Sequence, residues 1–365
     1  MMDFPLKPVI RDHRVIMPIV IILNGVALAT AINLVVSLNP EDKITSKRGS
    51  ALTLLGFIYF MSLSEILNMT ALYTGLGHRY RNKFRLSCGD VLDITNKFVS
   101  AVQAAFSCVT GAIVCLWSCT RDFMRTSHYM SEAYAWFGAA YFFYDIWSMY
   151  IVHLKMYSKR RPFKNGSTQL SSGDGASVKK PDTSFLAYCK HEPVILMHHL
   201  FIGGFGFLVI VYLRGDLGDC TFGFVYLMEL STPFVSARGI LSRLKLKSSR
   251  LYLINGLLML ATFFVCRVIS LPYVCYLYSK VIGSSYIDAV KSLPTGCKIS
   301  ICILLLPQLY WFYLMCTGAL KMLLGGTPSA GGEVAGEGGA GDQICPYTKR
   351  LYGLKQIDFS QQSHK

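Results

Sequence analysis

Long apolar stretches separated by short polar segments run through most of this chain. Eight of them are long enough to cross a bilayer core of about 30 Å, since an α-helix rises about 1.5 Å per residue. They are residues 15–38, 51–76, 98–119, 133–154, 194–213, 220–240, 251–278 and 298–324. The strict alternation of apolar and polar residues that marks a half-buried strand is absent from the sequence. The pattern predicts an all-α, polytopic membrane protein with about eight transmembrane helices in a bundle.

The polar segments divide the chain into three predicted parts. Residues 1–50 form a polar N-terminus and an extra first helix, residues 51–324 form the main membrane domain, and residues 325–365 form a Gly-rich flexible tail. The first span is longer than the apolar region of a signal peptide, about 7–15 residues, so we expect it to be retained. A polar loop at about 155–192 interrupts the main domain. Within it, residues 167–180 have almost nothing apolar to bury and are predicted to be disordered.

Composition and charge agree with a membrane protein. The chain is 52% hydrophobic and 16% charged, with a mean hydropathy of +0.40, whereas a soluble domain carries about a quarter charged residues. The net charge of +15 does not indicate nucleic-acid binding, because the basic residues flank the apolar spans instead of forming one basic domain.

The distribution of the basic residues predicts how the chain crosses the membrane. When basic residues near the span ends are counted with the adjoining loops, the N-terminus, the C-terminus and the loops after the second, fourth and sixth spans hold 26 of the 36 Lys and Arg residues, whereas the alternate loops hold 9. Cytosolic loops of membrane proteins are enriched in Lys and Arg. Both termini are therefore predicted to be cytosolic.

Cysteine usage predicts neither a disulfide framework nor a metal site. The 12 cysteines are scattered, mostly in apolar spans, and no two form a CxxC pair. Cys115 and Cys119 are one helical turn apart, and we expect them to be packing residues. The prediction is that no metal is bound.

Ionisable side chains inside the predicted spans are the main candidates for function, because a charge in the bilayer core is costly unless it meets a partner, a cavity or a substrate. The candidates well inside the spans are Glu65, Asp145, His198, His199, Glu229 and Arg267. The histidine pair lies about 6–8 Å from the cytosolic end of the fifth span. A neutral imidazole there could act as a general base or accept an acyl group, and Asp145 could orient its ring or bind an amine. The alternative is that neighbouring helix groups satisfy all three side chains.

Glu229 and Arg267 are predicted to form a structural ion pair. They lie about 14 Å and about 16 Å from the same side of consecutive spans, and helices joined by a short loop are usually neighbours. A substrate contact by Glu229 is the alternative. Gly203 and Gly204 either permit close helix packing or leave room for an acyl chain. Asp216 and Asp219, in the turn between the fifth and sixth spans, are expected to cap it.

Several motifs together resemble those of the TRAM–Lag–CLN, or TLC, domain family. They are YFFYDIWSMY (Tyr141–Tyr150), HH (His198–His199), LRGDLGD (Leu213–Asp219), ELSTPFVS (Glu229–Ser236), INGLLMLATFFVCR (Ile254–Arg267) and PQLYWF (Pro307–Phe312). The resemblance covers about Ala51–Leu324. Within the family it is nearest to the ceramide-synthase-like "TLC domain-containing protein 3" subfamily.

The resemblance implies ceramide synthesis by N-acyl transfer from acyl-CoA to a sphingoid base, in an endoplasmic reticulum or Golgi membrane. It implies no bound cofactor, acyl-CoA as co-substrate, and membrane lipids as partners. The implied catalytic residues are His198, His199 and Asp145, with substrate contacts at Glu65, Glu229, Gly203 and Gly204. True ceramide synthases carry a His-Asp pair about thirty residues after the first His pair, where this chain has Glu229-Leu-Ser-Thr. A non-catalytic, lipid-binding regulator of membrane composition therefore remains the alternative.

The predicted orientation has a direct test at Asn165. Asn165-Gly166-Ser167 is a formal N-glycosylation sequon, but it lies in the most basic loop, which the charge pattern assigns to the cytosol. We expect no glycan at this site after expression in cells. A gel shift that disappears both with a glycosidase and on Asn165→Gln substitution would reverse the orientation.

Overall fold

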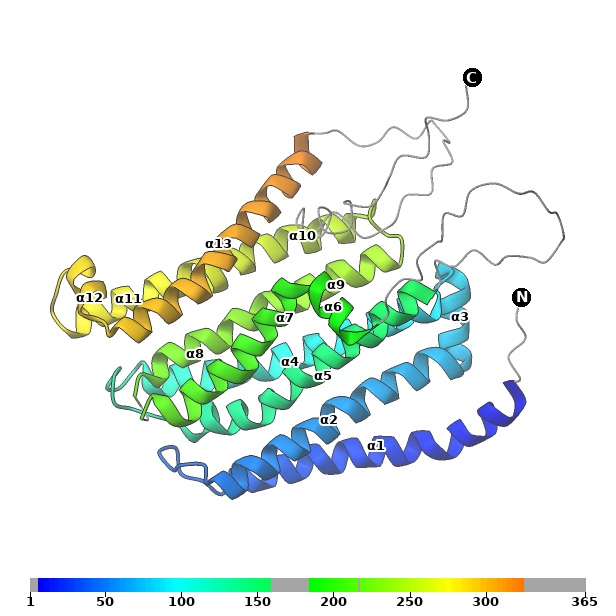
Figure 1. Cartoon of the computed structure of the whole chain (residues 1–365), viewed down its shortest axis with the longest axis horizontal. Coiled ribbons are helices and arrows are strands. Elements are labelled where there is room, and N and C mark those ends of the chain that lie inside the picture. The colour runs from blue at the N-terminus through cyan, green and yellow to red at the C-terminus, as the bar shows by residue number, and fades with distance from the viewer. Residues whose placement is uncertain (1–5, 159–183, 216, 325–365) are drawn as a thin grey trace. The chain divides into compact units, whose positions relative to one another are not determined.

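A computed structural model describes residues 6–158, 184–215 and 217–324, and within these ranges every regular element is a helix (Figure 1). The all-α prediction is confirmed. The predicted disordered segment 167–180, the sequon at Asn165, Asp216 and the Gly-rich tail lie outside the described residues.

Helices cover all eight predicted spans. The first five spans correspond to α1 Leu6–Val36, α2 Ser46–Tyr73, α4 Cys88–Ser118, α5 Tyr129–Ser158, and α7 Pro193–Leu200 with the π-helical segments η1 Phe201–Gly206 and η2 Val209–Leu213. The sixth span corresponds to α8 Asp219–Leu227, η3 Met228–Ser231 and α9 Thr232–Arg243. The seventh corresponds to α10 Arg250–Phe263, η4 Phe264–Ile269 and α11 Ser270–Val281, and the eighth to α13 Thr295–Leu324. Three short helices lie between spans: α3 Gly75–Phe84, α6 Phe185–His191 and α12 Tyr286–Ser292.

Six of these helices are long and apolar enough to cross a membrane. They are Val15–Val36, Ser46–Tyr73, Cys88–Ser118, Pro193–Leu213, Arg250–Val281 and Thr295–Leu320. The other two predicted spans differ: α5 is rich in Tyr and Trp and carries Glu132, Asp145 and Lys155, and α8, η3 and α9 divide the other into three shorter elements. The chain is thus a polytopic helical membrane protein.

The helices form two compact units that share α4. The first unit comprises Met1–Leu38, Ile44–Val99 and Glu132–Leu213. The second comprises Asn39–Lys43, Ser100–Ser131 and Arg214–Lys365.

In the first unit, α5 is the most buried helix, and residues 132–141 are all buried. Small residues of α2 let the two helix backbones approach closely. A Cβ atom on Gly49 would lie 2.2 Å from the Trp136 ring, and one on Gly56 would lie 2.4 Å from the Phe137 carbonyl oxygen. Between them, the Thr53 hydroxyl donates to the Trp136 carbonyl at 2.8 Å. Because its neighbours shield α5, this helix tolerates more polar side chains than a lipid-facing helix would.

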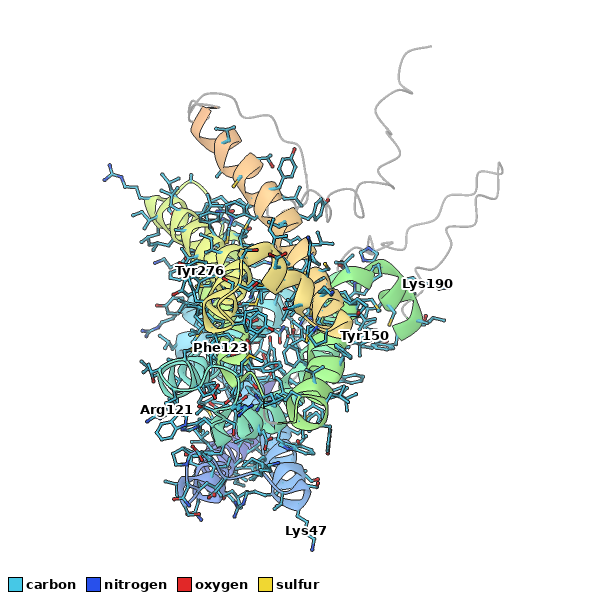
Figure 2. All side chains as sticks on the ribbon, turned by 90° about the vertical axis from the view of Figure 1, so that its left-hand side faces the viewer. Lys47, Arg121, Phe123, Tyr150, Lys190 and Tyr276 are labelled. Carbon is cyan, nitrogen blue, oxygen red and sulfur yellow. A yellow bond between two sulfur atoms is a disulfide. The ribbon has the colours of Figure 1, made fainter. Side chains whose placement is uncertain are left out.

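The far end of α5 packs against the short helix α6. The Tyr150 ring lies 5.2 Å from the Phe185 ring and 5.6 Å from the Tyr188 ring, measured between centroids. Lys190 extends away from this aromatic group (Figure 2). Burial and the nearby Glu192 carboxylate raise the pKa of Tyr188, so its hydroxyl remains protonated at physiological pH. Aromatic rings and outward-pointing lysines at a helix end are typical of a membrane boundary.

In the second unit, glycines join the C-terminal half of α4 to α8. A Cβ atom on Gly111 would lie 2.7 Å from the Gly223 carbonyl oxygen, and one on Gly223 would lie 2.6 Å from the Cys115 sulfur. The Ser107 hydroxyl also donates to the Tyr226 carbonyl at 3.0 Å. The two helices therefore pack backbone to backbone, as membrane helices with small interfacial residues do.

Two prolines explain where the spanning helices of this unit depart from α geometry. Pro233 lies in the first turn of α9 and follows the 3₁₀ turn η3, while Pro272 lies in the first turn of α11 and follows the π turn η4. Proline lacks the N–H that would bond four residues back, so the preceding turn tightens or widens. Glu229 lies in the first of these turns and Arg267 in the second.

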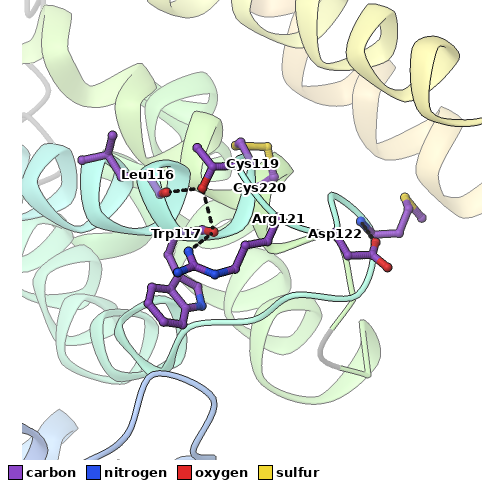
Figure 3. Close-up of a disulfide and its surroundings, with 8 residues drawn as sticks. Leu116, Trp117, Cys119, Arg121, Asp122 and Cys220 are labelled. Carbon is purple, nitrogen blue, oxygen red and sulfur yellow. Dashed lines mark hydrogen bonds between the residues drawn. A yellow bond between two sulfur atoms is a disulfide. The ribbon is translucent and has the colours of Figure 1, made fainter.

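The prediction that the chain has no disulfide is wrong. Cys119, at the end of α4, is bonded to Cys220 of α8 across 101 residues of sequence (Figure 3). Beside this bond, the Arg121 guanidinium lies 3.5 Å from the centre of the Trp117 ring. Cys220 is fully buried and packs with Phe123 and Val274. Scattered cysteines gave no spacing signal because this pairing depends only on the packing of α4 on α8.

Asp219 is also used differently from the predicted cap. Its carboxylate forms an ion pair with Arg214 and accepts the His128 backbone N–H at 2.8 Å, and its side chain is fully buried. Burial lowers the pKa of His128 against the opposing effect of Asp219, so the ring is neutral near pH 7. This agrees with the Met130 N–H donating to the His128 Nδ1 atom at 3.1 Å.

The disulfide predicts a measurable difference between oxidised and reduced protein. Denatured full-length protein should take up two more molecules of a thiol-reactive polyethylene glycol after reduction than before it. The Cys119→Ser/Cys220→Ser variant should lose this difference and melt at a lower temperature, because a crosslink over about 100 residues removes roughly 4–5 kcal/mol of chain entropy from the unfolded state. Labelling that does not change on reduction of the parent protein would show that the bond is absent.

Candidate functional site

His199 and Asp145 form a buried pair in the first unit. The His199 Nε2 atom lies 2.8 Å from the Asp145 Oδ2 atom, and the two side chains are 14% and 6% exposed. The histidine is carried by α7, which begins at Pro193, and the aspartate by α5. Because α7 continues into the π-helical segment η1, the histidine lies directly beside a departure from α geometry, which is frequent at functional sites.

Both ring nitrogens of His199 face acceptors. Nδ1 lies 2.8 Å from the Ile195 carbonyl oxygen, which can only accept a hydrogen bond, so Nδ1 must carry a proton. Nε2 faces the Asp145 carboxyl group, so a second proton must lie between these two groups. It belongs either to an imidazolium beside a carboxylate or to a carboxylic acid beside a neutral imidazole. In this geometry both ring nitrogens of His199 have partners within the protein.

A chain of polar groups supports the second oxygen of Asp145. The Asn96 side-chain amide donates to Asp145 Oδ1 at 2.8 Å, and the Tyr144 hydroxyl donates to the Asn96 carbonyl oxygen at 3.1 Å. All three side chains are buried. Because Tyr144 fixes which end of the amide faces the carboxyl group, Asn96 holds Asp145 in register with His199.

His198 lies beside this pair. Its ring centroid is 5.9 Å from that of His199, and the two rings are nearly perpendicular. The Phe142 ring packs on His199 at a centroid distance of 5.9 Å. Neighbouring residues on a helix point about 100° apart, so only one histidine can meet Asp145 in this way.

The other predicted substrate contacts of this unit differ in their surroundings. A Cβ atom on Gly203 would lie 2.6 Å from the Phe142 Cβ atom, which favours the packing alternative for this glycine. A Cβ atom on Gly204 would meet nothing within 4 Å, so this position has open space beside it. Glu65 is exposed on α2.

In the second unit, the structure brings Glu229 and Arg267 together. The Arg267 Nη2 atom lies 3.2 Å from the Glu229 Oε1 atom, with side chains 10% and 22% exposed. The guanidinium also donates to the Ser231 hydroxyl at 2.8 Å and to the Thr232 hydroxyl at 2.9 Å. Gln308 of α13 completes the arrangement, with its Oε1 atom 3.5 Å from Arg267 Nη1.

This second cluster is a closed hydrogen-bond network. The Thr232 hydroxyl donates to Glu229 Oε2 at 2.6 Å while accepting from the guanidinium, so both charged groups are held by the same threonine. Gln308 is 2% exposed. Charged groups at this depth are tolerated because several neutral partners share the guanidinium protons.

Sequence reasoning missed Asn96 and Gln308. Asn96 was placed outside the predicted third span, but α4 begins earlier because Ser87 and Asp90 cap it reciprocally, through the Ser87 N–H to Asp90 at 2.9 Å and the Asp90 N–H to Ser87 at 3.3 Å. Reading Ser87-Cys-Gly-Asp90 as a capping box would have put Asn96 inside the helix. Gln308 is the polar residue of the motif PQLYWF within an apolar span, but the motif alone did not indicate a contact with Arg267.

The described residues contain no group of three or more His, Cys, Asp or Glu side chains that could hold a metal ion. The first cluster brings together an imidazole, a carboxyl group and an amide. The second cluster offers ion pairing.

Comparison with known proteins identifies relatives over part of the chain. The family model described as "TLC domain" matches residues 93–317, more than half of the sequence. Human "TLC domain-containing protein 4" is 33% identical over 102 residues, which are 27% of this chain and 39% of that protein. "TLC domain-containing protein 4 A" of Dictyostelium discoideum is 29% identical over 131 residues, 35% of this chain and 48% of that protein.

The chain thus matches less than half the length of these two curated relatives. Their names carry a different number from the subfamily indicated by the motifs, so the subfamily stays a prediction. No solved structure matches the chain.

The Glu229–Arg267 cluster predicts a specific pattern of variant stability. Glu229→Gln should lower the yield of folded protein, because it leaves a buried guanidinium without its counter-charge. Arg267→Gln should lower it for the converse reason, and breaking a buried pair in this way typically costs about 3–5 kcal/mol. The double variant should recover much of the loss, since it removes both charges.

The measurement is the yield of monodisperse protein and its melting temperature in one detergent for the four proteins of the cycle. Thr262→Ala is a matched control, because its hydroxyl bonds only within its own helix, to Leu258 and Met259. Losses that simply add in the double variant would mean that the two residues depend on different partners.

Proposed function

The chain belongs to the TLC domain family, as its motifs predicted, and we propose that it transfers an acyl group from acyl-CoA to the amine of a sphingoid base, forming a ceramide. The observation that carries the proposal is the buried His199–Asp145 pair beside His198, in a membrane protein of this family. In acyl transfer to an amine, the leaving sulfur takes up one proton and the amine nitrogen loses one. The His199–Asp145 pair contains a proton that it can donate to the sulfur and replace from the nitrogen.

The proposed reaction balances without a further reagent. The neutral amine attacks the thioester carbonyl carbon, a C–N bond forms and the C–S bond breaks. The His199–Asp145 pair gives its proton to the departing sulfur and takes up the proton that the amine nitrogen releases. The products are an amide and the free thiol of coenzyme A. His198 contacts the reacting carbonyl group. In the alternative route a His198 ring nitrogen attacks the thioester carbon as the C–S bond breaks, and the amine then displaces the imidazole from the acyl group, so the products are the same.

Asn96 and Tyr144 are proposed as positioning residues. They hold one oxygen of Asp145, so the other oxygen stays directed at His199 while the proton moves. An orienting carboxyl group of this kind improves catalysis by fixing the geometry of the imidazole.

The disulfide supports a place in a secretory-pathway membrane. Cys119 and Cys220 lie in segments that the distribution of Lys and Arg assigns to the lumen, and disulfides persist in oxidising compartments such as the lumen of the endoplasmic reticulum. The same orientation puts the histidine pair near the cytosolic side, where acyl-CoA is supplied. We therefore propose an endoplasmic reticulum or Golgi membrane, with both termini in the cytosol.

One observation favours a second candidate, a non-catalytic lipid-binding protein that regulates membrane composition. Both His199 nitrogens already have partners within the protein, as in a structural histidine. Glu229, at the position of the second motif of true ceramide synthases, is likewise occupied by Arg267 and Thr232. In this alternative the same polar groups serve only to hold the helices.

Activity measurements on variants distinguish the two candidates. Purified full-length protein in lipid is given acyl-CoA and sphinganine, and ceramide is measured by mass spectrometry. His198→Ala, His199→Ala and Asp145→Asn are compared with the parent, and at least one histidine variant should lose about 10²–10⁴-fold in rate, the usual contribution of general acid–base catalysis. His78→Ala is the matched control, because this histidine is exposed on α3.

Two results would contradict the enzyme proposal. Parent protein without ceramide formation, but with saturable binding of sphinganine or acyl-CoA, would favour the lipid-binding alternative. Full activity in the His198→Ala/His199→Ala double variant would remove both histidines from the mechanism.

A further inference from the structure

The short helix α3 is fixed at a bend after the spanning helix α2, and Figure 1 shows it turning sharply away from the α2 axis. A single residue, Thr74, separates the two. Its hydroxyl donates to the Thr70 carbonyl at 2.6 Å and accepts the Gly77 N–H at 3.1 Å, so it ends one helix and caps the next. A Cβ atom on Gly77 would lie 2.4 Å from the Thr70 and Ala71 carbonyl oxygens, so this close approach requires glycine.

A side-chain contact ties the last turn of α3 back to α2. The Arg81 guanidinium donates to the Leu72 carbonyl at 2.8 Å and so satisfies a backbone acceptor in the last turn of α2. Directly after this turn, Arg85 adopts a left-handed conformation with φ 50° and closes α3 through its backbone N–H. The helix is therefore a rigid arm and not a loose connection.

One face of α3 is exposed and apolar. Leu76, Tyr80 and Phe84 recur every fourth residue, which places them on the same side of the helix. Leu76 is 61% exposed and Tyr80 is 55% exposed, while Tyr80 and Phe84 stack at a centroid distance of 6.3 Å. The polar His78 and Asn82, bonded to each other at 3.1 Å, lie on the opposite side. An apolar face continuous with the end of a spanning helix lies at the boundary between headgroups and acyl chains.

Basic residues border this face. Arg79 and Lys83 are one turn apart, both are exposed, and the Lys83 Nζ atom lies 5.4 Å from the centre of the Phe84 ring. The sequence has no acidic residue between Glu65 and Asp90 that could neutralise them. The chemistry that matches an apolar stripe bordered by unneutralised cations is an acyl chain joined to an anionic headgroup.

We propose that α3 is an interfacial helix that binds anionic phospholipids of the leaflet in which α2 ends. Leu76, Tyr80 and Phe84 lie among the upper acyl chains, and Arg79 and Lys83 contact the lipid phosphates and carboxylates. This site is independent of the proposed acyl transfer, because it uses none of the residues assigned to that reaction.

The test is native mass spectrometry of the full-length protein in detergent, titrated with phosphatidylserine or phosphatidylcholine. The parent should bind phosphatidylserine more tightly. Arg79→Gln/Lys83→Gln should weaken phosphatidylserine about 25-fold, at about five-fold per basic residue removed, and leave phosphatidylcholine unchanged. Arg79→Lys/Lys83→Arg, which keeps both charges, should retain the parent affinity.

The matched control is Lys247→Gln/Arg250→Gln, which removes the same charge just before α10 and at its first residue, and should leave phosphatidylserine binding as in the parent. Soluble glycerophosphoserine at equal concentration should not displace the lipid, since it lacks the acyl chains. Equal affinity of the parent for both lipids, equal losses in the control and the α3 variant, or displacement by the soluble headgroup would each overturn the proposal.

Discussion

The Asp145 carboxyl group lies inside a membrane-length helix, where an unpaired charge costs at least about 2.5–3.5 kcal/mol. Its partners come from two other helices, Asn96 of α4 and His199 of α7. These contacts fix the longitudinal register of three helices, because each oxygen of Asp145 has one donor at hydrogen-bond distance. The small residues that let α5 pack closely on α2 then exclude lipid from its polar face. The first unit is built around the need to satisfy this one carboxyl group.

The second unit also holds charged groups inside spanning helices, but it satisfies them with an ion pair in two distorted helical turns. Pro233 and Pro272 each follow a turn that departs from α geometry, and those turns carry Glu229 and Arg267. A distorted turn frees backbone groups and changes the direction of its side chains. Ser231 and Thr232, in and beside the tightened turn, therefore face the guanidinium together with Glu229. Each member of the ion pair therefore lies in a distorted turn that a proline follows closely along the chain.

Much of this organisation could be predicted from the sequence, because the bilayer constrains it strongly. The spans followed from apolar length, and the juxtaposition of Glu229 and Arg267 followed from equal depth on consecutive helices. The Cys119–Cys220 bond did not, because no spacing rule connects cysteines 101 residues apart. Asn96 was missed because a polar residue before an apolar run looks like a loop until its helix cap is recognised. The rigid attachment of α3 depends on the Arg81 contact with the α2 backbone, which composition cannot reveal.

The same hydrogen bonds decide between a structural and a catalytic histidine. His199 cannot accept a further proton while Nδ1 donates to Ile195 and Nε2 shares a proton with Asp145. In the proposed acyl transfer the shared proton would therefore leave first, and the departing thiolate of the acyl thioester would accept it. Once that proton has left, the lone pair of the His199 Nε2 atom would face the Asp145 carboxylate. This arrangement would favour transfer of a proton from the amine nitrogen to the imidazole. Burial and pairing, which stabilise the resting helices, thus also set the order in which protons would move.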